Sequence, residues 1–241
     1  MSALKAQINA EISLVRRNGE QLLVTLGIPL LLLTFFSLVD ILPSDAANSV
    51  DFLVPGILAL AVMSTSMVSL GIGTGFERSY LVLKRLAATP LGTPRLIVAK
   101  TVAVAVVEAA QMALLVGLGL LLGWSPVSAN WLLAVIAVVV GTAAFAGIGL
   151  TLAGNLGGEV NLAASNGLYL VLLLVGGVLF PLDRLPAPLE WVGRGLPTYA
   201  LSDVLRDALM SSGNHGGSSW IVLFIWAVVA PTIASATFRW N

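Results

Sequence analysis

Long apolar stretches that alternate with short polar breaks constrain the fold of this chain more than any other feature. Six such stretches are predicted, at 21–42, 52–75, 96–124, 131–154, 160–179 and 220–238. Each has about the 20 residues that an α-helix needs to cross a bilayer. The remaining chain is too short for a soluble domain. We therefore expect an all-α membrane protein with six transmembrane helices, folded as a single transmembrane domain over residues 1–241.

The composition agrees with this class and excludes several others. Hydrophobic residues make up 58% of the chain and charged residues 10%, against roughly 25% charged residues in a soluble domain. The 12 basic and 12 acidic residues balance, which leaves no basic surface for nucleic acid. Without cysteine, disulfides and thiolate metal sites are excluded. The single histidine, His215, has no second ligand nearby, so we expect no metal site.

Two segments outside the apolar stretches are predicted to form helices at the membrane surface. Residues 1–18 have one apolar and one charged side, which is typical of an amphipathic helix that lies on the bilayer. Residues 182–218, between the fifth and sixth spans, are expected to form short external helices. One of these has Leu201, Leu205 and their neighbours on one face and Asp203 on the other, which predicts an interfacial amphipathic helix.

A third segment, 76–92 between the second and third spans, is polar and charged in an otherwise apolar chain. Glu77 lies in its first turn and Lys84 and Arg85 lie near its last, as the helix dipole favours. Pro90 disfavours helical geometry for the residue before it. We therefore expect one helix that ends about two residues before Pro90, suited to docking on a partner protein.

The distribution of lysine and arginine sets the expected orientation, because short cytoplasmic flanks are enriched in basic residues. Nine of the 12 fall on one side: Lys5, Arg16, Arg17, Arg78, Lys84, Arg85, Arg95, Lys100 and Arg239. The other three are Arg184, Arg194 and Arg206. Both termini and the segment 76–92 are therefore expected to be cytoplasmic, and 182–218 to be external.

Two blocks of residues, far apart in the chain, carry a resemblance to a known family. The first contains Glu77-Arg78, then Leu83-Lys84-Arg85-Leu86-x-x-Thr89-Pro90-Leu91, and Lys100. The second contains Gly176-Gly177-Val178-Leu179-Phe180-Pro181-Leu182-x-x-Leu185-Pro186, then Leu196-Pro197-Thr198 and Asp203-x-x-Arg206. On a six-span frame, this combination resembles the ABC transporter type-2 permeases, which export drugs, lipids and polysaccharides. The resemblance covers nearly the whole chain.

The resemblance implies partners. Two permease protomers, either two copies of this chain or two related chains, would form the membrane path. Each would contact a separate ABC ATPase subunit through the helix after the second span, so 76–92 would be the coupling helix. ATP and Mg would be bound by that ATPase partner, and no cofactor by this chain. The external residues Phe180, Pro181, Pro197 and Arg206 would belong to the outer gate.

The resemblance also implies roles within the coupling helix. Leu83 and Leu86 would fill a groove of the ATPase, and Pro90 would fix the return into the third span. The flanking ion pairs would be made by Glu77, Arg78, Lys84 and Arg85, and Leu91 completes the motif. One departure is Leu81, which stands where a glycine is common in the family.

The sequence contains no nucleotide-binding motif of its own. A phosphate-binding loop needs G-x-x-x-x-G-K-[ST], because glycine amides surround the phosphates. The nearest match, Ala99-Lys100-Thr101, lacks both glycines and enters a membrane span. Hydrolysis of ATP is therefore expected on a separate chain.

Glu108, near the middle of the third span, is the strongest candidate for a transport role inside the membrane, because ionisable groups are costly there. The alternative is a buried carboxylate, protonated or hydrogen-bonded to neighbours such as Gln111. Asp40, near the end of the first span, is expected to be solvated.

Small residues predict close contacts between helices. Ser66, Ser69 and Gly73 share one face of the second span, which suits either helix packing or the substrate path. The fourth span, 131–154, is rich in glycine and alanine and is expected to pack closely on its neighbours.

Three classes of function are considered for such a membrane chain. The resemblance implies the permease subunit of an ATP-driven exporter in a bacterial inner membrane, which would move a lipophilic drug or lipid outward by alternating access. An ion-coupled secondary transporter should show intramembrane ionisable clusters and inverted repeats. An intramembrane enzyme needs a nucleophile with a base, or several metal ligands, within reach. No such set is found in the sequence, so we expect a transport subunit and not an enzyme.

Overall fold

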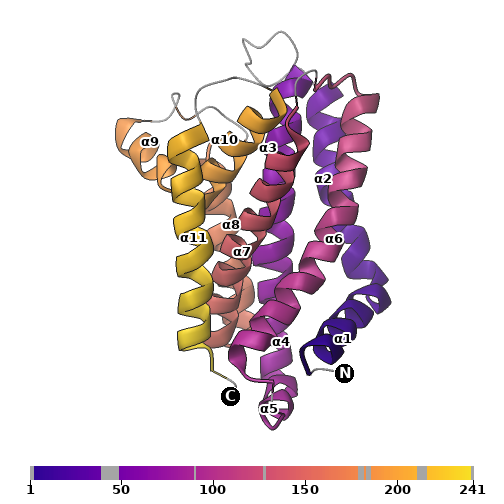
Figure 1. Cartoon of the computed structure of the whole chain (residues 1–241), viewed down its shortest axis with the longest axis vertical. Coiled ribbons are helices and arrows are strands. Elements are labelled where there is room, and N and C mark those ends of the chain that lie inside the picture. Colours follow the sequence, from indigo (N-terminus) through magenta and orange to yellow (C-terminus); the bar gives the residue numbers. More distant parts are fainter. Residues whose placement is uncertain are drawn as a thin grey trace.

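Every regular element of the computed structural model is a helix within the residues it describes, namely 3–38, 49–89, 91–126, 129–178, 182, 186–210 and 216–239 (Figure 1). In chain order the helices are α1 (Ala3–Arg17), α2 (Gly19–Leu38), α3 (Ser49–Met63), η1 (Ser64–Ser69), α4 (Leu70–Ser79), α5 (Val82–Ala87), α6 (Thr93–Leu121), α7 (Trp131–Asn155), α8 (Gly158–Val175), α9 (Ala187–Arg194), α10 (Pro197–Met210) and α11 (Gly216–Thr237). The predicted all-α class is confirmed.

Five helices are long and apolar enough to cross a membrane. They are Val50–Ser79, Thr93–Leu121, Trp131–Asn155, Gly158–Val175 and Gly217–Thr237. The predicted first span corresponds to α2, whose apolar part is the shorter Thr25–Leu38. Part of that span, with Asp40, falls in 39–48, outside the described residues. The structure therefore has helices of membrane length for five of the six predicted spans, and the first span stays a prediction.

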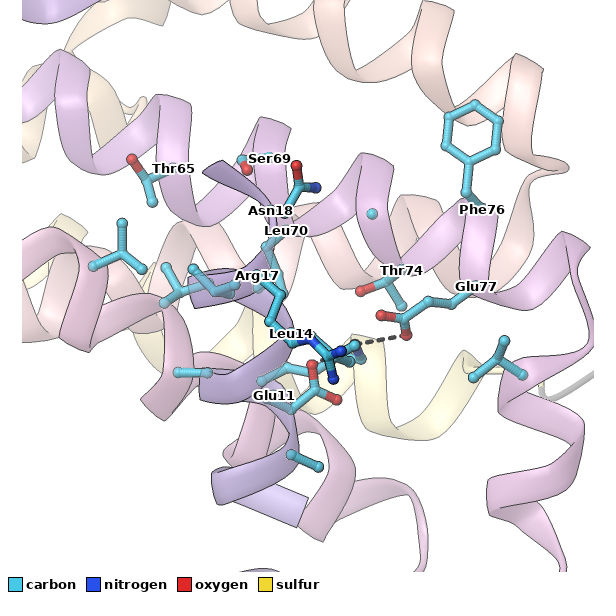
Figure 2. A pocket seen from close by; sticks show the side chains of 18 of the residues that line it. Glu11, Leu14, Arg17, Asn18, Thr65, Ser69, Leu70, Thr74, Phe76 and Glu77 are labelled. Carbon is cyan, nitrogen blue, oxygen red and sulfur yellow. Dashed lines mark hydrogen bonds and ion pairs between the residues drawn. The ribbon is translucent and has the colours of Figure 1, made fainter. Parts of the chain in front are cut away.

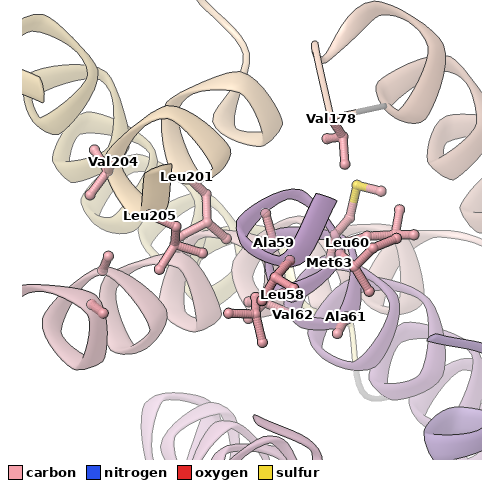
Figure 3. Packing of buried hydrophobic residues seen from close by; sticks show 14 of the residues in the cluster. Leu58, Ala59, Leu60, Ala61, Val62, Met63, Val178, Leu201, Val204 and Leu205 are labelled. Atoms are coloured by element: carbon pink, nitrogen blue, oxygen red, sulfur yellow. The ribbon is translucent and has the colours of Figure 1, made fainter. Parts of the chain in front are cut away.

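The second span is the centre of the molecule. It runs without a break through α3, η1 and α4, and it is buried far more than the other four long helices. Buried side chains of α3, such as Leu58 and Met63, pack against Leu201 and Leu205 of α10 and against Val178 (Figure 3). Lipophilic residues on all sides of α3 therefore reflect contact with protein, not with lipid.

Glycines allow the helices around this central span to approach closely. A Cβ atom on Gly71 of α4 would lie 3.0 Å from the carbonyl oxygen of Gly149 in α7. A Cβ on Gly147, two residues before Gly149, would lie 2.4 Å from the backbone nitrogen of Pro231 in α11. The predicted close packing of the fourth span is thus explained by backbone contacts on two of its faces.

The position of α10 differs from the one predicted for the external segment 182–218, in which an interfacial amphipathic helix was expected. Its apolar residues do lie on one face, but Leu201, Val204, Leu205 and Leu209 are buried against α3, α7 and α11. An amphipathic pattern shows that one face needs an apolar neighbour, and it does not distinguish a bilayer from a protein core. α10 is therefore part of the bundle and not an interfacial helix. His215 lies outside the described residues.

The two ends of the bundle differ in what they carry. α1, α5 and the C-terminal end of α11 lie at one end, and α9 and α10 lie at the other (Figure 1). α1 is a separate helix, as predicted for 1–18, and it packs along the first part of α6. This arrangement brings both chain ends and the segment after the second span together.

Candidate functional site

The segment 76–92 does not form the single helix that was expected. Glu77 and Arg78 lie in the last turn of α4, and the chain turns at Tyr80 and Leu81 before the short helix α5 begins. Leu81 has a φ of 61°, in the left-handed region that a helix cannot continue through. The family's glycine at this position has a physical reason here, because glycine adopts positive φ without steric cost.

Replacing Leu81 by glycine is therefore expected to stabilise the folded protein by about 1 kcal/mol, because left-handed geometry strains a side chain with a Cβ. Leu81→Ala keeps the Cβ and is the matched control, expected to give no such gain. Denaturant titration of the purified variants in mixed micelles measures the difference. Equal stability of the glycine and alanine variants would show that the turn stores no strain.

Leu83 has a different role from the one expected. It is completely buried and packs with Leu91, Leu96 and Phe238, while Leu86 is partly buried against the same cluster. Leu83 therefore attaches α5 to the bundle and cannot fill a groove of a partner. The prediction was wrong because helical spacing identifies an apolar face without showing what covers it. Pro90 lies outside the described residues.

A different set of side chains around the same turn is exposed. Tyr80 is 72% exposed, Leu81 53% and Val82 41%, and Lys84 and Arg85 are exposed as well. We call these five residues the α5 surface. It combines apolar and basic groups at one end of the bundle. On the opposite face of α5, Leu83 packs against the bundle and holds the helix in place.

Glu77 forms an ion pair inside the chain. The Lys100 ammonium lies 2.7 Å from a Glu77 carboxylate oxygen and 3.1 Å from a Glu11 oxygen. Lys100 is 2% exposed, and Gln7 donates a further hydrogen bond of 2.7 Å to Glu11. The ion triad of Glu11, Lys100 and Glu77 thus joins α1, α6 and α4. Lys100 and Glu77 were recognised in the sequence as parts of one motif. The sequence did not indicate that they form an ion pair with each other.

Arg78 also acts within the chain. Its Nη1 group donates to the carbonyl oxygens of Ala153, at 3.2 Å, and Leu156, at 3.1 Å. Both oxygens lie at the C-terminal end of α7, where carbonyl groups lack helical partners and a cation is favourable. Arg78 therefore links α4 to α7 within the chain. Its ion pair with an ATPase stays a prediction.

A cavity of about 710 Å³ opens beside the ion triad, between α1, α4 and α6 (Figure 2). Ser69, Gly73 and Thr74 of the second span line it, and a Cβ on Gly73 would meet nothing within 4 Å. Gly73 therefore faces open space, so helix packing is the wrong one of its two interpretations. Ser66 does not line the cavity; it is fully buried and donates to the carbonyl oxygen of Val62.

Glu108 lies in a buried polar group at the level of η1. One of its carboxylate oxygens accepts a hydrogen bond from Thr142 of α7, and the other has no hydrogen-bond partner in the described part of the chain. Gln111 was expected to be its neighbour but pairs with Thr65 at 3.0 Å and with the carbonyl oxygen of Thr25 at 2.8 Å. Thr142 belongs to another span, and nothing in the sequence indicated that contact.

Arg206 links the outer elements. Its guanidinium donates to the carbonyl oxygen of Val178 at 2.9 Å and lies 4.0 Å from the ring centroid of Phe52. Burial lowers the pKa of Arg206 to about 10, which leaves it charged at neutral pH. Pro197 is buried at the start of α10. Phe180 and Pro181, also assigned to the outer gate, lie outside the described residues.

A helical bundle with several apolar helices of membrane length, joined by buried polar contacts, defines a multi-pass integral membrane protein. Residues 33–236 match the family described as "ABC-2 family transporter protein". The chain therefore belongs to the ABC-2 family of transporter proteins, as its motifs indicated, and is a transmembrane subunit of an ABC transporter.

A curated relative supports the same assignment. The chain is 28% identical over 202 residues to the protein named "Putative transport permease YvfS" of Bacillus subtilis strain 168. The match covers 83% of this chain and 82% of that protein. The similarity therefore extends over most of the chain and not over one motif.

Proposed function

We propose that the chain is the permease subunit of an ATP-driven exporter in a bacterial inner membrane, with both termini cytoplasmic. It carries a lipophilic drug or lipid outward and assembles with a second permease protomer. ATP and Mg are bound by separate ATPase subunits that dock on the α5 surface. The observation that carries this proposal is the α5 surface itself, which presents Tyr80, Leu81 and Val82 beside Lys84 and Arg85.

The contacts behind that surface supply a route for coupling. α5 is fixed to the bundle by Leu83, and α4 is fixed to α6 and α1 through Lys100 and to α7 through Arg78. A push on α5 would therefore move the central second span together with three neighbouring helices. Alternating access needs such a rigid connection between an ATPase and the membrane path.

Lys84→Glu combined with Arg85→Glu is expected to lower the retention of the ATPase at least about tenfold, because reversing charges at an interface replaces attraction by repulsion. Both side chains are exposed, so the fold should be unaffected. The measurement is co-purification from detergent with the ATPase encoded nearest the gene. Glu190→Lys, a charge reversal at a partly buried position on α9 at the opposite end of the bundle, is the control.

Retention of the ATPase by wild type and control, with loss in the double variant, supports the proposal. If the double variant retains the ATPase as wild type does, α5 is not the docking site. Leu83→Asp is unsuitable for this test, because it would bury a charge in the cluster that holds α5.

A further inference from the structure

We propose that the cavity between α1, α4 and α6 binds an amphipathic cation, with an apolar body of drug size and one ammonium or amidinium group. This inference rests on the proposed transport function, because it names the class of substrate that would enter the protein at the end of the bundle that carries α1 and α5. The volume of about 710 Å³ lies within the range of about 300–1,000 Å³ for small-molecule pockets.

The walls of the cavity are apolar and one region of it is polar. Leu14, Leu22, Leu70, Val104 and Val107 are among the apolar lining residues. The polar lining residues include the ion triad and Thr74 (Figure 2), and also Gln7, Arg17, Asn18, Thr25, Thr65 and Ser69. A ligand that fills this space must therefore have both an apolar body and a polar group.

The charge of the ion triad selects the sign of that polar group. Two carboxylates, Glu11 and Glu77, face one ammonium, Lys100, so the charges of the triad sum to one negative charge. Glu77 contacts Lys100 through one carboxylate oxygen, and its side chain is 26% exposed. Arg17 also lines the cavity, but it is exposed, so water and salt screen its charge.

Thr74 provides an independent sign of a missing ligand. Its side chain is 1% exposed, and its hydroxyl oxygen has no hydrogen-bond partner in the described part of the chain. Figure 2 shows this hydroxyl directed into the space beside the Glu77 carboxylate. An unpaired buried hydroxyl is unfavourable, and a ligand ammonium could donate to both Thr74 and Glu77.

Three fluorescent probes that differ only in their end group test the inference. Each carries a dansyl group on an eight-carbon chain that ends in an ammonium, a hydroxyl or a carboxylate. Binding is titrated on the full chain in phosphatidylcholine nanodiscs at pH 7, with empty nanodiscs subtracted. The ammonium probe is expected to bind at least about tenfold more tightly than the hydroxyl probe, because charged hydrogen bonds are the stronger ones.

Two variants locate the site. Glu77→Gln should reduce the affinity for the ammonium probe to that for the hydroxyl probe. Thr74→Val keeps the shape of the side chain and should lower the affinity for the ammonium probe about threefold to tenfold. Because Thr74→Val removes an unpaired buried hydroxyl, it should not destabilise the fold. Thr232→Val, on the exposed side of α11, is the matched control and should leave binding unchanged.

Several results would overturn the inference. They are equal binding of the three probes, no binding, or an unchanged affinity of the ammonium probe in Thr74→Val. Tightest binding of the carboxylate probe would instead indicate a site for anionic headgroups near Arg17. The Lys84→Glu and Arg85→Glu double variant should lose the ATPase and still bind the ammonium probe, so this inference and the proposed function can fail separately.

Discussion

Replacing Lys100 by methionine is expected to destabilise the protein by about 3–5 kcal/mol, because removing one partner of a buried ion pair leaves the other charge uncompensated. Here the loss would leave two carboxylates, Glu11 and Glu77, facing each other without a cation. Glu11 is only 7% exposed, so water cannot replace the ammonium there. The free energy of unfolding in mixed micelles measures the effect.

Two further variants separate this cause from a simple loss of a basic residue. Lys84→Met removes an exposed lysine and should change stability by no more than about 0.5 kcal/mol. Adding Glu11→Gln and Glu77→Gln to Lys100→Met removes the unpaired charges and should restore much of the lost stability. If Lys100→Met behaves like Lys84→Met, the ion triad does not hold α1, α4 and α6 together.

The same region shows how far the sequence could predict the structure. The motif residues Glu77, Arg78 and Lys100 were recognised, and Lys100 was placed on the third span, which begins within a few residues of α6. Glu77 and Arg78 were assigned to a separate helix, whereas they lie in the last turn of α4. Their partners were not predicted, because Lys100 and Glu11 are separated by 89 residues. Helical periodicity gives the direction of a side chain within its own helix and contains no information about which other helix lies opposite.

Leu83 and Leu86 illustrate the limit for apolar residues. Their spacing predicted a face that needs a cover, and the cover could have been an ATPase, lipid or the chain itself. The structure supplies Leu91, Leu96 and Phe238 from the same chain, and the exposed apolar residues of this segment are Tyr80, Leu81 and Val82 instead. The same ambiguity applies to α10. Its apolar face was predicted to lie at the membrane interface, but it is buried in the protein.

Glycine patterns were more informative than charges or leucines, because a glycine in a helix is unfavourable unless a neighbour needs the space. The expectation of close packing for the fourth span needed no knowledge of the partner helix. Gly73, in contrast, resembles Gly71 and Gly75 in sequence, but only those two face another helix closely. Small residues at helical spacing therefore predicted that a helix packs closely on its neighbours. They did not predict which glycines of that helix make the close contacts.

Gly149→Ala is expected to destabilise the protein by about 3 kcal/mol, at the upper end for overpacking. The new Cβ would lie 2.4 Å from the carbonyl oxygen of Met67 and 3.0 Å from its Cα atom. Both are backbone atoms of η1, so no side chain can rotate to make room. Relief would need α7 to move away from the central span, which would also disturb Gly71 on the next turn.

Gly117→Ala in α6 is the matched control, since a Cβ there would meet nothing within 4 Å. Alanine has the higher helix propensity, so this variant should be more stable by about 0.5–1 kcal/mol. The same substitution is thus expected to have opposite signs at two glycines of apolar helices. Denaturant titration in mixed micelles measures both variants, and a common sign would contradict the backbone contact between α7 and η1. A destabilised Gly149→Ala would show that α7 and the central span are held together at backbone contact.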